Sequence, residues 1–510
     1  MNQATVTDPP ESDATPESDG GGSLLWTIGL LVAAVLFLIV GLQWVGDIRF
    51  TGPKRETAAT LVVIGGALGI AAAAAIGRWS RPVGIGALIA VGIGVPAALF
   101  VVVDRAEGVL TAAERRPTAT ADQLPQGPGL AERAGSDATT VDVEVALEAW
   151  VNGLEIPTDA VFLDDGTLLV AERSGRVVAV TPDGARVDEP VVDVSADTSL
   201  DGEQGLTGIA LSPSGRLYLH RTDPAGDNQI LSFALDGLVA DPESRLEVLT
   251  VGQTLNNHNG GGIAFGPDGT LYVSVGDGGG VGDPKDNAQA SWNRLGTILR
   301  VIPDEVSGDY LIPPDNPWVD HDEIWPETIA YGLRNPLRIR VDAVTGDLWI
   351  GEVGDANFEE INVIPAGDMG QNFGWNRLEA DQVFQGSGRV PTEFDETDVP
   401  EPNTLPAFSY AHDKSEIEDV FTGTHPWRNS VTGGVRYRGA EIEGLYGVYL
   451  YGDFAANTFG GVAFDDQLQA VDDTVFDLEI AVPISIIEDP AGEIHVVSLG
   501  GTVSRLVAAR

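Results

Sequence analysis

The stretch Gly266–Asp277 reads GPDGTLYVSVGD, and it contains the pattern that decides the fold. A Pro-Asp-Gly turn comes first, and alternating apolar residues follow it, as in a strand that buries one face. Turns and strands of this kind recur along the chain. The units are DDGTLLVAE (164–172), SPSGRLYLH (212–220), GPDGTLYVSVGD (266–277), AVTGDLWIGEVGD (343–355), GLYGVYLYGDF (444–454) and DPAGEIHVVSLG (489–500).

The spacing of these units gives the architecture. The first steps are about 50 residues long and the middle ones are longer, which is the size of a four-stranded propeller blade with inserted loops. We therefore expect an all-β, six-bladed β-propeller over residues 145–510. A β-sandwich or barrel with similar turns is the alternative, because the spacing is not a clean repeat.

The first 144 residues have a different texture. Residues 1–22 are acidic, rich in Pro, Ser and Gly and poor in large apolar residues, which is typical of a disordered tail. Within residues 23–103, three uncharged apolar runs at 24–45, 58–77 and 83–103 are each long enough to cross a bilayer. They predict an α-helical transmembrane region, and residues 104–144, rich in Ala, Pro, Gly and charge, predict a linker.

Charge limits the partners of this chain. Its 29 Lys and Arg against 76 Asp and Glu give a formal net charge of -47. Such a surface excludes nucleic acid as a partner, because nothing would neutralise the phosphates. It favours a salt-adapted (halophilic) protein, since dense salt screens the self-repulsion; an acidic protein from an ordinary host is the alternative. Cysteine is absent, so any metal must take oxygen or imidazole ligands.

His258 is the first candidate for chemistry. It stands in NNHNGGGIAFGPDG, between Asn257 and Asn259 and before a glycine-rich stretch that permits close backbone approach. An imidazole that titrates near neutral pH is a natural base for a hydroxyl proton. A purely structural loop histidine is the alternative.

Two further motifs carry polar side chains beside predicted strands. YGLRNPLR contains Arg334 and Asn335, and a guanidinium can hold a carboxylate through two hydrogen bonds. GEVGDANFEEINVI follows it, with four carboxylates crowded into nine residues, a pattern that suits Ca²⁺. These carboxylates are Glu352, Asp355, Glu359 and Glu360.

The motifs taken together resemble a known family. In order along the chain they are GLEIPTDAVFLDDGTLLVAERSGRV, DGEQGLTGIALSPSGRLY, NHNGGGIAFGPDGTLYVSVGDGG, LGTILRV, ETIAYGLRNPLRI, GEVGDANFEEINVI, GQNFGWNRLE and TGGVRYRG. This series resembles the glucose/sorbosone and aldose sugar dehydrogenases, quinoproteins of the soluble type, across nearly all of Ile156–Leu506.

The resemblance implies a reaction and a cofactor. It implies pyrroloquinoline quinone (PQQ) over the propeller channel, with Ca²⁺ at its polar edge and a sugar as the substrate. His258 matches the base that takes the proton of the C1 hydroxyl while hydride passes to the quinone, which gives the lactone. Arg334 and Asn335 match residues beside the quinone, Arg334 polarising its oxygen, and Glu203 and Asn257 match polar positions that face the cofactor.

The resemblance also implies ligands for calcium and for the cofactor carboxylates. The carbonyls of Gly354 and Asp355 match ligands of the cofactor-bound Ca²⁺, and Glu359 and Glu360 match a second, structural calcium site. Arg438 in RYRG matches a basic residue that faces the PQQ carboxylates.

Three parts of the sequence depart from this pattern or extend it. Gly278 replaces a Gln that some members carry, and YGDFAANTFGGV lacks a basic residue that relatives have there. Each lost charge-assisted hydrogen bond is worth about 1.5–3 kcal/mol of cofactor binding. His412 and His425 lie in a loop that could line the substrate entrance or simply face solvent.

Other functions fit the same fold. The propeller could lack the cofactor and serve as a binding or cell-surface module, as some animal relatives of the family do, or it could be a calcium-dependent sugar lactonase. If it is a dehydrogenase, the predicted spans place it on a membrane, where a respiratory carrier could accept its electrons.

The location of the propeller has two conflicting indications. Arg49, Lys54 and Arg55 in the first loop would place that loop and the propeller in the cytoplasm by the positive-inside rule. The family resemblance implies an extracytoplasmic propeller on a multi-pass anchor in the cell membrane, and that is our expectation.

Overall fold

The computed structural model describes residues 116–120, 123–124, 137–290, 292–384, 403–412 and 430–509. The chain divides into two compact units, Met1–Glu107 and Gly108–Arg510, and all described residues belong to the second. The tail predicted at 1–22 and the spans predicted at 24–45, 58–77 and 83–103 lie outside the described residues. Within the described ranges, no helix has the length and apolar character needed to cross a membrane.

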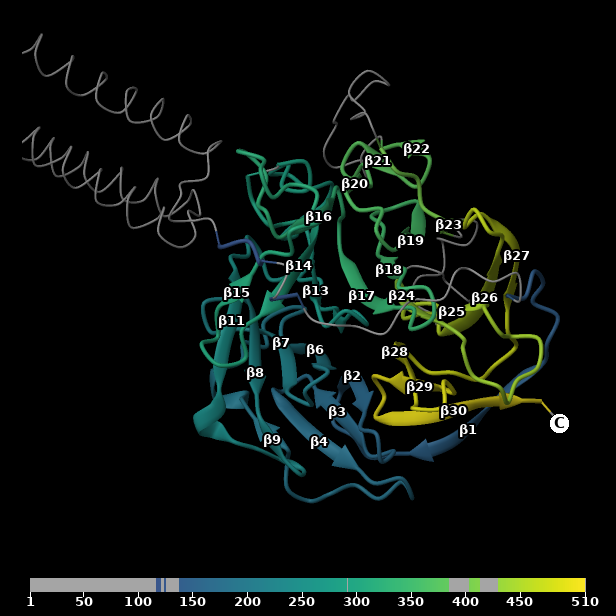
Figure 1. Cartoon of the computed structure of the whole chain (residues 1–510). Coiled ribbons are helices and arrows are strands. Elements are labelled where there is room, and N and C mark those ends of the chain that lie inside the picture. Colours follow the sequence, from purple (N-terminus) through teal and green to yellow (C-terminus); the bar gives the residue numbers. More distant parts are fainter. Residues whose placement is uncertain are drawn as a thin grey trace, which may run out of the picture. The chain divides into compact units, whose positions relative to one another are not determined.

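The second unit is a ring of six blades, each built on four antiparallel strands, so the predicted six-bladed β-propeller is confirmed (Figure 1). Blade 1 is β2 (Pro157–Phe162), β3 (Leu168–Glu172), β4 (Arg176–Val180) and β5 (Val192–Asp193). Blade 2 is β6 (Leu206–Leu211), β7 (Leu217–Thr222), β8 (Asn228–Phe233) and β11 (Leu246–Val251). Blade 3 is β12 (Ile263–Phe265), β13 (Leu271–Val275), β14 (Thr297–Pro303) and β16 (Thr328–Tyr331).

The other three blades follow the same order from the channel outward. Blade 4 is β17 (Pro336–Val341), β18 (Leu348–Glu352), β19 (Phe358–Ile364) and β23 (Phe408–Ala411). Blade 5 is β24 (Val431–Arg436), β25 (Tyr449–Asp453), β26 (Thr458–Phe464) and β27 (Ala470–Val475). Blade 6 is β28 (Pro483–Glu488), β29 (Ile494–Ser498), β30 (Thr502–Ala508) and, as its outermost strand, β1 (Val145–Val151).

Short elements fill the loops between these blades. They are η1 (Ser195–Asp197), β9 (Leu235–Asp236), β10 (Val239–Ala240), η2 (Pro242–Ser244), β15 (Tyr310–Leu311), β20 (Gln371–Asn372), β21 (Leu378–Glu379) and β22 (Gln382–Val383). Strand β20 pairs in parallel with β16 and extends blade 3.

Blade 6 closes the ring with strands from both ends of the described chain. Val145 of β1 pairs with Ala508 of β30, and the antiparallel register continues to Val151, which pairs with Val503. In Figure 1, β1 and β30 lie side by side. This pairing covers the edge of β30 and joins the two ends of the described chain, so that the blades keep only short edges at their outermost strands.

The turn motifs found in the sequence all lead into the second strand of a blade. Each unit covers all or most of one of these second strands, which are β3, β7, β13, β18, β25 and β29. In the turn before β13, the amide of Gly269 donates to the carbonyl of Gly266 at 2.9 Å, and Gly269 has a φ of 77°, which favours glycine. The local turn chemistry therefore joins the first two strands of each blade.

The apolar core lies between neighbouring blades. Trp349 of β18 stacks on Tyr449 of β25 with ring centroids 4.8 Å apart, and both side chains are buried. Nearer the channel, a Cβ on Gly351 would lie 2.3 Å from the Cα of Gly433, so only glycine permits this approach of β18 and β24.

Polar groups close the centre of the ring. Asp159 of β2 is fully buried and accepts hydrogen bonds from Arg340 at 2.5 Å and from Ser485 at 2.6 Å. Burial acts to raise the pKa of Asp159, but Arg340 and Arg338 outweigh it and the pKa is lowered. This carboxylate therefore joins blades 1, 4 and 6 as an ion.

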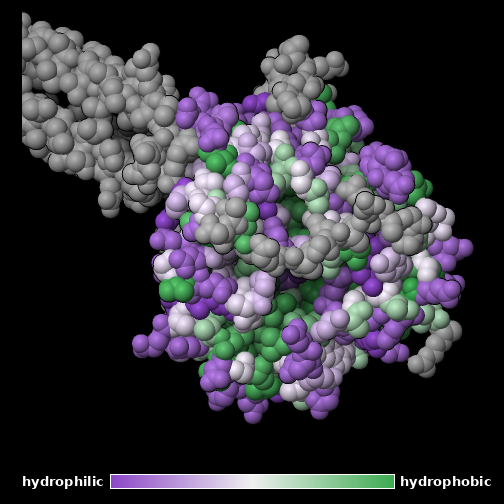
Figure 2. Space-filling model, viewed as in Figure 1, coloured by the Kyte–Doolittle hydropathy of each residue, from purple (hydrophilic) through white to green (hydrophobic). Residues whose placement is uncertain are grey.

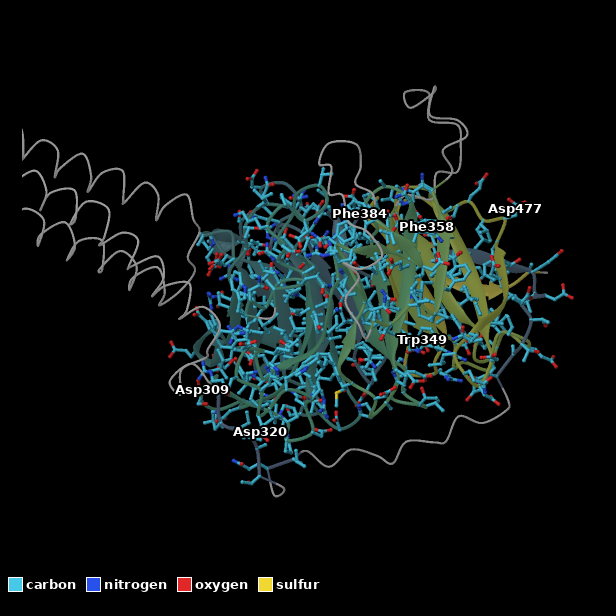
Figure 3. The ribbon with its side chains drawn as sticks, turned by 90° about the horizontal axis from the view of Figure 1, so that it is seen from above. Asp309, Asp320, Trp349, Phe358, Phe384 and Asp477 are labelled. Carbon is cyan, nitrogen blue, oxygen red and sulfur yellow. The ribbon has the colours of Figure 1, made fainter. Side chains whose placement is uncertain are left out.

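The blade order also defines two faces of the ring. The upper face is formed by the loops that precede the innermost strand of each blade and by the loops that join its second strand to its third. The lower face is the opposite face of the ring. In the edge-on view of Figure 3, Phe358 and Phe384 lie toward one edge, and Asp309 and Asp320 toward the other. Figure 2 shows a hollow at the centre of the ring, with apolar residues in its walls.

Candidate active site

His258 lies on the upper face, in the loop between β11 and β12, and is 4% exposed. Its Nδ1 is 2.8 Å from Oδ1 of Asp277, and its amide donates to Oε2 of Glu203 at 2.8 Å. The residue has a φ of 53°, and a Cβ on Gly276 would lie 2.1 Å from its carbonyl oxygen. Glycine at 276 is thus what lets the histidine loop and the end of β13 come together.

Asp277 orients the imidazole from behind. This carboxylate is fully buried and also accepts from the amide of Gly279 at 2.8 Å and from Nε1 of Trp375 at 2.9 Å. A carboxylate with these donors accepts the Nδ1 proton of His258, which leaves Nε2 as the basic nitrogen. No described residue hydrogen-bonds to Nε2. The arrangement suits a general base.

A second carboxyl group lies in the same loop as Asp277. Asp283 is 2% exposed, its Oδ2 accepts from the amide of Ala288 at 2.8 Å, and its Oδ1 is buried without a partner. Burial and the charge of Asp277 raise the pKa of Asp283 to about 7. Near neutral pH this group is partly protonated, which limits the negative charge behind His258.

Arg334 and Asn335 lie in the loop between β16 and β17, beside the histidine loop. The guanidinium of Arg334 donates to the carbonyl of Val353 and to Oδ1 of Asp355, each at 3.1 Å, while its Nε is buried without a partner. Oδ1 of Asn335 accepts from the amide of Gly260 at 3.0 Å. The structure therefore brings Arg334 and Asn335 to the same face as His258, and their roles stay predictions.

Glu352 supports this loop from below. Its Oε1 accepts from the amides of Arg334 at 2.5 Å and Asn335 at 3.2 Å. Burial and the charge of Glu360 raise the pKa of Glu352 well above its ordinary value. The carboxyl group of Glu352 therefore holds the backbone of both residues in place.

The residues predicted to bind the cofactor-bound calcium lie next to Arg334. The carbonyls of Gly354 and Asp355 accept no main-chain hydrogen bond within the described ranges, and Oδ2 of Asp355 is buried without a partner. These are hard oxygen donors of the kind that Ca²⁺ takes. No group of three or more histidine and carboxylate side chains that could hold a metal occurs among the described residues.

The structure does not bring Glu359 and Glu360 together for the predicted second calcium. They are neighbours in β19, so their side chains point to opposite faces of the sheet. Glu359 contacts Nε2 of His412 at 2.6 Å and the amide of Val431 at 2.9 Å, whereas Glu360 accepts from the amide of Ala380 at 2.6 Å. The protein thus supplies separate partners for the two carboxyl groups.

Arg438 is not at this site, which corrects the expectation from RYRG. It follows β24 on the lower face, whereas His258 and Asn335 precede their innermost strands on the upper face. Its Nε donates to Asp342 at 3.0 Å and its NH1 to Asp137 at 2.7 Å. The motif correctly marked a strand of the propeller, but the side chain lies beyond the other end of that strand.

The departures from the family pattern have local explanations. A Cβ on Gly278 would lie 2.5 Å from Oγ1 of Thr254, so this loop has no room for a glutamine. At the start of 455–460, the amides of Ala455 and Ala456 donate to Asp453, and the segment brings no cation. His425 lies outside the described residues.

Asp277 and Trp375 are the site residues that the sequence reasoning missed. Asp277 lies in the motif LYVSVGD and Trp375 in the motif GQNFGW, but neither motif by itself indicates a role for these side chains. The sequence did contain a signal for Asp277, because it directly follows the strand after the His258 motif and a carboxylate at that position could orient the imidazole. Nothing local linked Trp375 to it, because 98 positions separate the two residues.

The chain is thus a six-bladed propeller that carries a histidine oriented by a carboxylate, an arginine and an asparagine on one face. Such a set of side chains suits acid–base chemistry. The family model described as Glucose / Sorbosone dehydrogenase matches residues 154–498, and the chain belongs to this family.

Individual proteins are also similar to this chain. HIPL2 protein from Arabidopsis thaliana is 34% identical over 331 residues, and the match covers 53% of this chain and 46% of that protein. Hedgehog-interacting protein from Mus musculus is 27% identical over 338 residues, covering 61% of this chain and 43% of that protein. The chain therefore matches less than half the length of these two relatives.

A solved structure supports the fold. The PQQ-bound form of aldose sugar dehydrogenase from Streptomyces coelicolor aligns with a TM-score of 0.56 at 22% identity, over 73% of this chain and 100% of that one. At this identity the likeness establishes the propeller and nothing finer.

Proposed function

We propose that this propeller oxidises the C1 hydroxyl of an aldose to a lactone, with PQQ and Ca²⁺ as cofactors. The observation that carries the proposal is the His258–Asp277 pair, whose geometry leaves Nε2 of His258 as a base on the upper face. Membership of the glucose/sorbosone dehydrogenase family supports this type of reaction.

The donor set of the site fits the polar edge of such a cofactor. The Nε of Arg334 and Oδ2 of Asp355 are buried without partners, beside two main-chain carbonyls that accept no main-chain bond. Buried polar atoms of this kind call for a ligand, since leaving them unpaired costs about 1–3 kcal/mol each. Arg334 and Asn335 would hold the quinone, and Gly354 and Asp355 would hold the calcium.

The residues of this chain would divide the work as follows. His258 takes the hydroxyl proton on Nε2, and Asp277 stabilises the imidazolium that forms. Arg334 supplies positive charge on the same face, held there by Asp355 and Val353. Glu203 fixes the backbone of His258, and Asn257 stays a predicted cofactor contact. PQQ, when bound, supplies the electron sink that takes the hydride.

A cofactor-free binding module is the second candidate, and a specific observation favours it. PQQ is a tricarboxylic acid, and the described part of the site pairs its Arg334 with an acidic neighbour and lacks the contribution expected from Arg438. The Hedgehog-interacting relative is named for binding rather than for oxidation. A site with too few cations would bind the cofactor weakly.

Membrane attachment completes the proposal. It rests on the apolar runs at 24–45, 58–77 and 83–103, which would hold the enzyme as a multi-pass protein with an extracytoplasmic propeller. A respiratory carrier in the same membrane would then accept the electrons.

The test uses the full chain with PQQ, Ca²⁺, a panel of aldoses and an artificial electron acceptor. We expect PQQ-dependent dye reduction that His258→Gln lowers by about 10²–10⁴-fold, the usual contribution of a general base. His321→Gln, in a loop between β15 and β16, is the matched control and should keep wild-type turnover. If the full chain binds no PQQ in a fluorescence titration with Ca²⁺, the dehydrogenase proposal fails and the binding module takes its place.

A further inference from the structure

Trp375 follows β20 and lies at the centre of the site without facing solvent. It is 4% exposed, and its ring packs on Phe384 with centroids 4.7 Å apart. Its indole N–H donates to Oδ2 of Asp277 at 2.9 Å, while Oδ1 of the same carboxylate contacts His258 at 2.8 Å. Trp375, Asp277 and His258 therefore form one continuous chain of hydrogen bonds.

The backbone around Trp375 is held as firmly as the ring. Its amide donates to the carbonyl of Gly332 at 2.9 Å, and its carbonyl accepts from Nε2 of Gln289 at 2.6 Å. Gly332 lies two residues before Arg334, and Gln289 lies in the loop that carries Asp277. The indole is thus tied to both loops that supply the reactive side chains.

The hydrogen bond from the indole N–H stabilises the ionised form of Asp277. With three donors, from His258, Gly279 and Trp375, the buried carboxylate is stable as an ion and accepts the Nδ1 proton. Without the indole donor, Oδ2 would be a buried hydrogen-bond acceptor without a donor, which is unfavourable. Uptake of one proton from solvent at Oδ1 of Asp277 would remove the charge on this carboxyl group, and the protonated acid would then donate to Nδ1.

That exchange would remove the base. If Asp277 donates to Nδ1, the single proton of the neutral imidazole of His258 must lie on Nε2. Nε2 then has no lone pair for the hydroxyl proton. The hydrogen-bond partner of Nδ1 decides which ring nitrogen of His258 carries the proton. Here that partner is Asp277, and Trp375 in turn decides whether Asp277 accepts or donates.

We propose that Trp375 is a positioning residue that keeps His258 in its reactive tautomer, with the proton on Nδ1, by holding Asp277 as an ion. Its effect on turnover rests on the proposed dehydrogenase function, whereas its effect on the tautomer does not. The indole ring also lies under Arg334, 5.7 Å from the guanidinium carbon. Phenylalanine at 375 keeps an aromatic face there but removes both the N–H and part of the ring, so a second Trp→Phe variant is needed as the control.

The first measurement is the tautomer itself. The chain has six histidines, so ¹⁵N-histidine NMR of the full chain without cofactor can resolve His258, assigned by its loss in His258→Gln. We expect wild type to carry the proton on Nδ1 and Trp375→Phe to shift His258 mainly to the Nε2–H form. Asp277→Asn serves as the reference for an imidazole that has lost its carboxylate.

Trp325→Phe is the matched control. Trp325 also donates its indole N–H, to the carbonyl of Trp292 at 2.8 Å, and its ring also lies against an arginine, Arg294, at 3.7 Å. It contacts neither Asp277 nor His258, so the control should leave the tautomer unchanged. A wild-type tautomer in Trp375→Phe, or an equal shift in Trp325→Phe, overturns the proposal.

The second measurement links the tautomer to turnover. With PQQ, Ca²⁺ and an aldose, Trp375→Phe should lower kcat on the order of tenfold or more with little change in KM, as expected when an outer residue orients a reacting one. A shifted tautomer with unchanged kcat would overturn the catalytic role of Trp375. If wild type itself shows no turnover, the proposed function fails, while the NMR result still decides whether Trp375 sets the tautomer.

Discussion

Glu488→Gln should stabilise this propeller at neutral pH, although it removes a charge beside two arginines. Glu488 is the last residue of β28 in blade 6, it is partly exposed, and no protein group hydrogen-bonds to its carboxyl among the described residues. Burial and the charge of Asp342 raise its pKa from 4.5 to about 8, against the opposite effect of Arg340 and Arg438. Glutamine keeps the size of the side chain and never ionises.

The magnitude follows from the pKa. Between pH 4.5 and 8 the folded state binds more protons at Glu488 than the unfolded state does, so the free energy of unfolding falls as pH rises through this window. One pKa unit corresponds to about 1.4 kcal/mol, which gives at most about 4 kcal/mol of destabilisation at pH 7.5. Partial exposure of the side chain reduces the expected value to about 2 kcal/mol.

The assay is urea unfolding of wild type and Glu488→Gln at fixed ionic strength, at pH 5 and at pH 7.5. We expect the variant to be about 2 kcal/mol more stable at pH 7.5 and nearly equal at pH 5, where ionisation of Glu488 costs little. Glu443→Gln, at an exposed position in blade 5, should show no such difference. A variant that is less stable at pH 7.5, or offset equally at both pH values, would refute this reasoning.

Two further predictions concern stability. Asp137→Asn should destabilise the folded state by about 1–3 kcal/mol, because Asp137 accepts from Arg436 at 2.5 Å and from Arg438 at 2.7 Å; thermal unfolding with and without salt would measure this, and an unchanged midpoint at low salt would contradict it. Deletion of 145–151 should abolish the cooperative unfolding transition and promote aggregation, because it exposes the edge of β30; a monomeric product with wild-type cooperativity in sedimentation and calorimetry would contradict that expectation.

Local chemistry made the propeller predictable from sequence. Each turn motif, such as the one ending at Gly269, specifies a hairpin by itself, and six of them in series specify six blades. The pairing of β1 with β30 was not predictable in the same way, because Val145 and Ala508 are joined by geometry of the closed ring rather than by any local signal.

The sequence allowed the candidate site residues to be located only where it also showed which end of a strand they lie at. His258, Arg334 and Asn335 lie on one face because each precedes an innermost strand, and their sequence motifs already marked them as candidates. Arg438 was misplaced because its motif fixes a strand and not the end at which a following side chain emerges. The role of Trp375 needed the tertiary structure, since a loop after β20 carries it to a carboxylate in another loop.

The closure of blade 6 has a consequence for biosynthesis. Strand β1 leaves the ribosome long before β30, and Val145 cannot meet Ala508 until the last blade has been translated. At about 5–20 residues per second, the nascent chain exposes an unpaired strand for tens of seconds. Only the two ends of β1 are buried in the finished ring, and charged Glu148 lies between them. Glu148 places a charge in the middle of this otherwise apolar strand, VALEAWV, and opposes its pairing with a neighbouring chain during the wait, so vectorial synthesis constrains the composition of β1 as well as the folded ring does.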